Sequence, residues 1–175
     1  MTQRTTTKSL NEQEFQPDLI EEVTRYCLLT RTRSISRVVT SIYDQALRPY
    51  DVNSSQFSML VLIARMNGGS RAELGRANHL ERSTSTRNLQ LLLDQGWIKE
   101  LAPTHGRSRP IVLSDAGREL LVTAMPAWRS AQQTAKRMLG KDGASALSSI
   151  ANRLPADGLA CLDEVPALQS RARLS

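Results

Sequence analysis

The chain has 175 residues, a formal net charge of +6 and a sequence pI near 9.9. This length suits one sizeable core, and the basic charge favours a polyanionic partner, because a positive field attracts negative charge. The longest apolar run, Met59–Ala64, is far shorter than the roughly 20 residues that span a bilayer, and the polar amino terminus lacks the apolar centre of a signal peptide. Two cysteines, Cys27 and Cys161, form no disulfide framework, so we expect a cytoplasmic protein that does not bind a membrane.

Residues 1–23 carry two cations against five anions, so the amino-terminal segment is acidic, and we expect its polar residues 1–16 to be a disordered tail. Pro17 and Asp18 begin a long predicted helix that runs to Arg48 and stops before the next proline. Within this helix, apolar side chains recur at the spacing of a buried stripe: Ile35, Val38, Val39, Ile42 and Ala46. The helix is therefore predicted to bury one face.

A second helix is predicted from Asn53 or Ser54, either of which can cap it, to Asn67. Its apolar positions on one face are Phe57, Leu60, Val61 and Ala64. The pair Gly68–Gly69 ends the helix, because glycine readily leaves the helical conformation.

The next segment predicts two helices joined by a turn. Ser70 and Glu73 form a capping box, in which each side chain accepts a hydrogen bond from the other residue's amide, so a short helix begins there. Asn78–His79 ends it, since both residue types tolerate a left-handed backbone better than most. A second helix contains residues 83–89 and ends near Gly96.

Two apolar-rich runs, Trp97–Ala102 and Arg109–Leu113, flank a turn at residues 103–108 that is rich in Pro, Gly and cations. These runs predict a β-hairpin. Helix, turn, helix and hairpin in this order form a winged helix-turn-helix, which places one helix in the DNA major groove and the hairpin beside it. We therefore predict a mainly α fold with a small β-hairpin wing.

Ser114 is predicted to cap a helix that starts at Asp115. The apolar residues of this helix are Leu120, Leu121, Ala124, Trp128 and Ala131. Pro126 lies inside it, so we expect a kink there. A last amphipathic helix is predicted over residues 142–154, and residues 155–175 are expected to be a weakly ordered tail.

We expect residues 17–154 to form a single winged-helix domain, with a DNA-binding part at residues 54–113. The helices at residues 17–48 and 115–154 are predicted to be dimerisation helices, because apolar stripes at both ends of a short chain bury against each other or against a second copy. A dimer also contacts two half-sites roughly 34–36 Å apart, whereas one recognition helix contacts few base pairs. Completion of a monomer core by the same helices is the open alternative.

Five segments occur in a characteristic order: Ser41–Pro49, Ser55–Leu60, Leu80–Leu89, Gly106–Arg109 and Val112–Arg118. Together they resemble the MarR-type (multiple antibiotic resistance) regulators. The resemblance implies a homodimeric bacterial repressor or activator of pseudo-palindromic duplex DNA, often released by a small aromatic ligand or by oxidation, and we favour a repressor. Many members have Asp-Arg-Arg at the wing tip, where this chain has His105-Gly106-Arg107, so only Arg107 matches.

A helical projection of the second helix of the turn motif selects candidate DNA contacts. Leu89 is taken as the centre of the buried face, and the residues beside it are Ser85, Leu92 and Leu93. Thr84 and Arg87 lie opposite. Arginine suits the guanine edge, asparagine the adenine edge, and serine or threonine suits phosphates or bases. The candidates on this helix are Arg82, Ser83, Thr84, Thr86, Arg87 and Asn88. For the serine and the threonines, capping of the helix amino terminus is the open alternative.

The wing adds two candidates. Arg107, at the glycine-containing tip, is predicted to enter a narrow minor groove, where the negative potential is strongest. Arg109 begins the return strand and is predicted to contact phosphate or to pair with an acidic neighbour. The alternative for both is a solvated hairpin charge.

Catalytic chemistry finds little support in the sequence. His79 and His105 are its two histidines, and we find no glycine-rich phosphate loop, no nucleophile elbow and no Cys or His pair with zinc spacing. We therefore expect no enzymatic activity, no cofactor and no metal. Cys27 lies near three arginines, which would lower the pKa of its thiol. Redox sensing and a small buried side chain are the alternatives for this residue.

Two classes of function remain. The first is a ligand-responsive transcription factor, whose expected partners are double-stranded DNA, a second copy of the chain and a small aromatic effector. The second is a winged-helix protein-interaction module, whose basic surface contacts an acidic partner.

Overall fold

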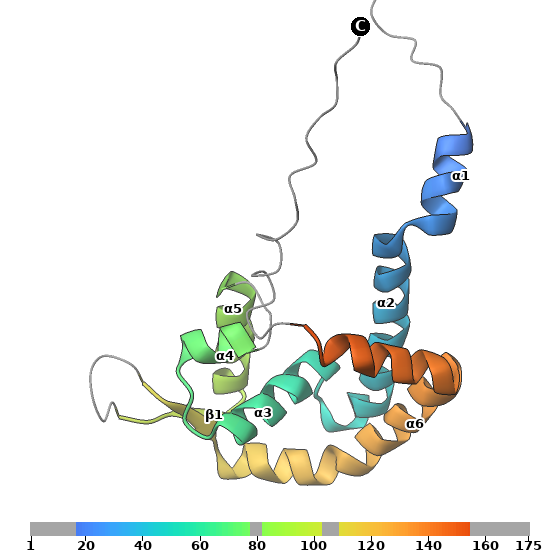
Figure 1. Ribbon diagram of the computed structural model, residues 1–175. Helices are drawn as coiled ribbons and strands as arrows, with labels where there is room; N and C mark the ends of the chain where they lie inside the picture. Colours follow the sequence, from blue (N-terminus) through green and yellow to red (C-terminus); the bar gives the residue numbers. More distant parts are fainter. Residues whose placement is uncertain (1–16, 78–81, 103–108, 155–175) are drawn as a thin grey trace, which may run out of the picture. The chain divides into compact units, whose positions relative to one another are not determined.

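The computed structural model describes residues 17–77, 82–102 and 109–154 (Figure 1). The chain divides into two compact units, with the boundary after Val38. The first contains α1 and the beginning of α2, and the second contains the remaining helices and a two-stranded antiparallel hairpin. The prediction of a mainly α fold with a small β-hairpin wing is confirmed.

The predicted single helix over residues 17–48 is instead two helices, α1 (Pro17–Tyr26) and α2 (Leu28–Leu47). The interruption lies at Cys27, and a short 3₁₀ helix, η1 (Arg48–Tyr50), follows α2. Across the interruption, the Arg31 guanidinium donates to the Arg25 carbonyl, with an Nε–O distance of 2.9 Å. A side-chain donor thus satisfies an acceptor in the last turn of α1, where helix carbonyls lose intrahelical partners.

The apolar stripe of α2 is less buried than the sequence predicts. Ile35 is 38% exposed and Val38 is 48% exposed. Val39, Ile42 and Ala46, further along the same helix, are half-buried. The prediction of a buried stripe is therefore wrong for the single chain at Ile35 and Val38, because the second core covers α2 near its carboxyl end, at Tyr43 and Leu47.

The helix α3 (Ser54–Met66) begins with a capping box, in which the Asn53 side chain accepts from the Gln56 amide and Gln56 accepts from the Asn53 amide. Its buried residues are Phe57, Met59, Leu60 and Ile63. Val61 is 43% exposed and Ala64 is also exposed, so the predicted face is wrong at these two positions. The buried face is turned toward α4, α5, β2 and α6, all of which α3 contacts.

The helix-turn-helix and the hairpin follow as α4 (Arg71–Ala77), α5 (Arg82–Asp94), β1 (Ile98–Glu100) and β2 (Ile111–Leu113). The two strands pair antiparallel (Figure 1). In their register, Ile98 lies opposite Leu113. These elements and α3 share one core, formed by Met59, Leu60, Ile63, Leu74, Leu89, Leu92, Ile98, Ile111 and Leu113. The predicted turns at residues 78–79 and 103–108 lie outside the described residues.

The last helix, α6 (Asp115–Ala151), starts where the sequence predicts, and the Ser114 hydroxyl accepts from the Gly117 amide at 3.1 Å. Its backbone departs from helical geometry at Gly140, where φ is +69°. The sequence predicts a kink at Pro126, but the non-helical dihedrals lie at Gly140, since a positive φ costs glycine little. Two helical stretches therefore meet at Gly140, close to the predicted start of the last helix.

The first turn of α6 packs directly on the connection between α5 and β1. The Ser114 hydroxyl donates to the Gly96 carbonyl at 2.6 Å, and the Ser114 amide donates to the Trp97 carbonyl at 3.0 Å. A Cβ added at Gly117 would lie 2.0 Å from the Trp97 carbonyl oxygen. Glycine is required here because the backbones approach too closely for any side chain.

A second core lies where the end of α2 and the start of α3 meet α6. Leu47, Val52, Phe57 and Ala124 are buried there, and half-buried side chains, Trp128 among them, pack against them. The Tyr43 hydroxyl donates to Gln132 on α6, and burial raises the pKa of Tyr43. Further along α6 the apolar side chains are exposed: Leu147, Ile150 and, just after the helix, Leu154.

Candidate nucleic-acid interface

The helix α5 turns one face to the core and the other to solvent. Leu89 and Leu92 are completely buried, and Ser85 is 3% exposed. The buried face predicted for this helix by the projection is confirmed at these three positions. Ser85 lies at the contact with α4, where a Cβ added at Gly75 would be 3.1 Å from the Ser85 hydroxyl oxygen. The small side chains allow α4 and α5 to pack closely.

The outer face of α5 carries most of the candidate DNA contacts. Ser83, Thr84 and Arg87 are exposed on this face, and Thr86, which is also exposed, lies nearer the buried side of the helix. The side chain of Arg82, at the first position of α5, lies outside the described side chains. Since the opposite face of α5 is fixed in the core, this polar surface has a defined orientation relative to α3 and α4.

Asn88 differs from the other candidates. Its side chain is half-buried, and its Nδ2 donates to the Ser55 hydroxyl in the first turn of α3 at 3.3 Å. This hydrogen bond links the outer edge of α5 to the start of α3. Sequence reasoning missed Ser55, because the bond joins residues that are 33 positions apart.

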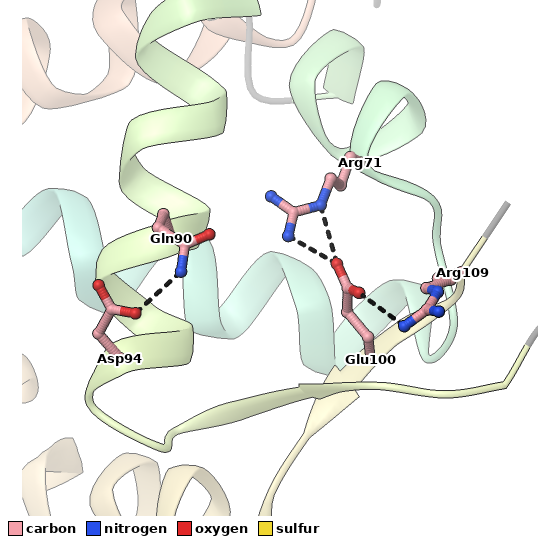
Figure 2. Close-up of polar contacts among 5 residues, drawn as sticks. All are labelled: Arg71, Gln90, Asp94, Glu100 and Arg109. Atoms are coloured by element: carbon pink, nitrogen blue, oxygen red, sulfur yellow. Dashed lines mark hydrogen bonds and ion pairs between the residues drawn. The ribbon is translucent and has the colours of Figure 1, made fainter.

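The base of the wing holds a charged cluster of three residues, Arg71, Glu100 and Arg109 (Figure 2). The guanidinium of Arg71, on α4, donates from Nε at 2.9 Å and from Nη2 at 2.6 Å to Oε1 of Glu100, on β1. The other carboxylate oxygen of Glu100 lies 3.8 Å from Nη1 of Arg109. The acidic neighbour predicted as one alternative for Arg109 is therefore Glu100, whereas Arg107 lies outside the described residues.

Sequence reasoning did not select Arg71 or Glu100. A signal was available in the hairpin register, which pairs Glu100 with Ile111 and so brings the start of the return strand close to Glu100. Diagonal neighbours across an antiparallel pair are within reach of long side chains. The contact with Arg71 had no such signal, because it depends on how α4 packs against the hairpin.

Two carboxylates at helix starts have lowered pKa values. Hydrogen bonds from the Ser70 hydroxyl and amide lower the pKa of Glu73, which confirms the capping box of α4. The hydrogen bond from Arg118 lowers the pKa of Asp115 in the first turn of α6. Both groups are negative at the positive end of a helix dipole, where a charge of that sign is favourable.

Cys27 is half-buried at the interruption between α1 and α2. Hydrogen bonds from the side chain and the backbone of Thr30 lower the pKa of its thiol, and the charge of Arg33 acts in the same direction. The direction matches the sequence-based expectation, but the hydroxyl of Thr30 contributes more than the arginine. The role of Cys27 in redox sensing stays a prediction.

The described residues also bear on metal binding and on membrane insertion. Among them, no three His, Cys, Asp or Glu side chains come together as a metal site would require. In the same residues, no helix combines the length and the apolar character that crossing a membrane needs. His79, His105 and Cys161 lie outside this part of the chain.

Comparison with known proteins gives matches of two kinds. The sequence profile of the MarR family matches residues 50–108. The M. tuberculosis transcriptional regulator MosR, solved in complex with DNA, is 32% identical, with a TM-score of 0.64 over 73% of this chain and 92% of that chain. No curated protein matches the chain significantly.

Two more distant structures have the same fold. A mutant MarR from E. coli, complexed with operator DNA, has a TM-score of 0.67 at 20% identity, over 77% of this chain and 98% of that chain. The S. aureus MepR–DNA complex has a TM-score of 0.63 at 18% identity, over 73% of this chain and 96% of that chain. These likenesses extend well beyond the 59 residues of the profile match.

Proposed function

The chain belongs to the MarR family of transcriptional regulators, and we propose that it binds pseudo-palindromic duplex DNA as a homodimer. The observation that carries the proposal is the exposed face of α5, where Thr84 and Arg87 lie beside the exposed Leu91, on a helix whose opposite face is fixed in the core. A recognition helix in the major groove needs such a rigidly held outer face.

The proposed contacts fall into two groups. Arg87 is suited to the O6 and N7 edge of guanine, and serine or threonine hydroxyls are suited to phosphates and bases. Arg109 is 65% exposed at the base of the wing and is suited to phosphate. The proposed DNA contacts are Arg82, Ser83, Thr84, Thr86, Arg87, Asn88, Arg107 and Arg109.

Apolar exposure at both ends of the chain supports the homodimer. On α1 and the start of α2 the exposed apolar side chains are Ile20, Val23, Tyr26, Leu28, Leu29, Ile35 and Val38. Leu147 and Ile150, on α6, are exposed as well. Burial of apolar surface between two copies would be favourable, and it would supply the second recognition helix that a two-part site requires. We therefore keep residues 17–48 and 115–154 as the proposed dimerisation helices of one winged-helix domain at residues 17–154.

The test is a binding titration on a duplex selected from a random pool by the wild-type protein. Arg87→Ala should weaken binding by about 1–3 kcal/mol and relax the base preference at one position in each half-site, because one bidentate base contact is lost. Arg129→Ala is the matched control, since it removes an exposed arginine from α6 and leaves α5 intact.

Each result has a defined meaning. If Arg87→Ala binds the selected duplex as the wild type does, α5 is not the recognition helix. If the wild type binds polyglutamate and selects no duplex, the protein is instead an interaction module for acidic partners. An inverted repeat in the selected sequences supports the dimer.

We extend the proposal to a repressor in the cytoplasm that responds to a small aromatic acid, which the family resemblance supports. A ligand can release DNA only by binding one arrangement of the two recognition helices better than another. Phenolic carboxylates should therefore weaken operator binding while the dimer mass stays constant, and fluorescence of Trp97 and Trp128 reports whether they bind. Ligand binding with unchanged operator affinity contradicts this mechanism.

A further inference from the structure

Glu100 is the acidic centre of the cluster at the base of the wing, with one arginine on each carboxylate oxygen (Figure 2). Its side chain is 22% exposed, whereas those of Arg71 and Arg109 are 37% and 65% exposed. The carboxylate is therefore the most enclosed of the three groups, and both guanidinium groups reach solvent. Two positive charges and one negative charge leave the cluster with a net charge of +1.

The two arginines come from different elements. Arg71 is the first residue of α4, in the helix-turn-helix, and Arg109 precedes β2, in the wing. The two hydrogen bonds from Arg71 hold the Glu100 carboxylate in one orientation, because a guanidinium offers its donors in a fixed plane. The second oxygen of Glu100 then faces Arg109, so the position of that guanidinium depends on the contact with α4.

We propose that Glu100 is a positioning residue that determines DNA specificity by restraining Arg71 and Arg109. The proposal rests on the function proposed above. An arginine near the duplex adds affinity for phosphate on any sequence. Glu100 neutralises part of this charge and holds both guanidinium groups in place, so that sequence-independent binding is limited and the wing keeps its orientation beside α5.

The variant Glu100→Gln tests this directly, because it keeps the size of the side chain and removes its charge. The amide oxygen of glutamine can still accept from Arg71, but the negative charge that offsets the two guanidinium groups is gone, so both attract phosphate more strongly. Each additional phosphate contact steepens the slope of log K against log salt by about 0.9 and raises affinity on the order of tenfold near 0.1 M salt. Affinity for a scrambled duplex should therefore rise, the salt slope should steepen by about one to two, and the ratio of specific to non-specific affinity should fall.

The matched control is Asp94→Asn. Asp94 ends α5, and its carboxylate accepts a hydrogen bond from the neutral Gln90 side chain at 2.8 Å (Figure 2). The substitution changes the net charge by the same amount as Glu100→Gln but leaves both guanidinium groups beside the charged Glu100. A second variant, Glu100→Asp, keeps the charge and shortens the side chain. It should leave non-specific affinity near that of the wild type.

The measurement is a salt titration of the full-length protein on the selected duplex and on a scrambled duplex of equal length. A steeper slope and a lower specificity ratio for Glu100→Gln than for Asp94→Asn support the proposal. Equal effects of the two variants would overturn it, since the loss of any negative charge would then explain the change in salt slope and specificity. Equal losses of affinity on both duplexes, with a lower melting temperature, would also overturn it and leave Glu100 a structural role. A wild type that selects no duplex from the random pool would overturn the proposed function itself.

Discussion

In the winged part, α3, α4, α5 and the hairpin bury side chains such as Leu60, Leu74 and Leu89 completely, whereas Leu28 and Leu29 at the start of α2 are 79% and 59% exposed. Both regions are rich in apolar residues. The difference is that the winged part contains its own covering layers, while the start of α2 has none among the described residues. The apolar side chains at the start of α2 are therefore free to pack against another surface, such as that of a second copy of the chain.

Polar contacts differ between the two regions in the same way. In the winged part, the contact between Ser114 and Gly96 and the Glu100 cluster join elements that are distant in sequence. On α1 and the start of α2, the hydrogen bonds and the ion pair given by the structure link residues at most six positions apart. The winged part is thus held by long-range contacts, and the terminal segment by local ones.

The first prediction concerns the contact between the winged part and the first turn of α6, whose loss should lower the free energy of unfolding. Gly117→Ala places a Cβ against the Trp97 carbonyl, so the backbones must separate, at a cost of about 3 kcal/mol in the free energy of unfolding. Urea unfolding at fixed protein concentration measures it. Gly143→Ala is the control, because its Cβ would meet Leu139 at an ordinary 3.6 Å. A loss below about 1 kcal/mol for Gly117→Ala would mean that the joint is looser than described.

A second prediction addresses the exposed end of α6. The double variant Leu147→Gln, Ile150→Gln keeps helix propensity and removes apolar surface, so it should weaken dimerisation by about tenfold to a hundredfold, or roughly 1.4–2.8 kcal/mol. Sedimentation equilibrium measures the dimer. Val122→Gln, at a site 74% exposed on the first stretch of α6, is the comparison. A double variant that dimerises as the wild type does would move the proposed interface away from this end.

A third prediction concerns the packing of α4 against α5 inside the winged part. The Ser85 hydroxyl is buried and has no hydrogen-bond partner among the described residues, so Ser85→Ala should be neutral or slightly stabilising. Gly75→Ala crowds the same hydroxyl. The two substitutions together should be more stable than the sum of their separate effects by about 0.5–1 kcal/mol, measured by a double-mutant cycle. Strict additivity would show that α4 and α5 can separate at little cost.

Sequence reasoning predicted well what depends on neighbouring residues. The cap at Ser70 and Glu73, the cap at Ser114 and the buried face around Leu89 depend on contacts within a few positions. The strands were likewise predicted near their observed places, because apolar runs on either side of a turn have few alternatives.

What the sequence did not predict depends on packing between elements. The interruption at Cys27 carries no proline or glycine, and the partners of Asn88 and Glu100 lie 33 and 29 positions away. The exposure of Val61 likewise depends on where α4, α5, β2 and α6 approach α3. Periodicity predicts that a helix has an apolar face, but the neighbouring elements determine its exact centre.

The contact between Gly117 and Trp97 also has a mechanical consequence. The Trp97 carbonyl lies against the α6 backbone, and Ser114 forms hydrogen bonds with the carbonyls of Gly96 and Trp97. The first turn of α6 is therefore tightly packed against the segment that follows α5. Rotation of that turn would displace the Trp97 carbonyl, and the Trp97 amide in turn donates to the Leu92 carbonyl of α5 at 3.1 Å. A movement of the first turn of α6 should therefore also move the end of the proposed recognition helix, because these few backbone contacts join the two.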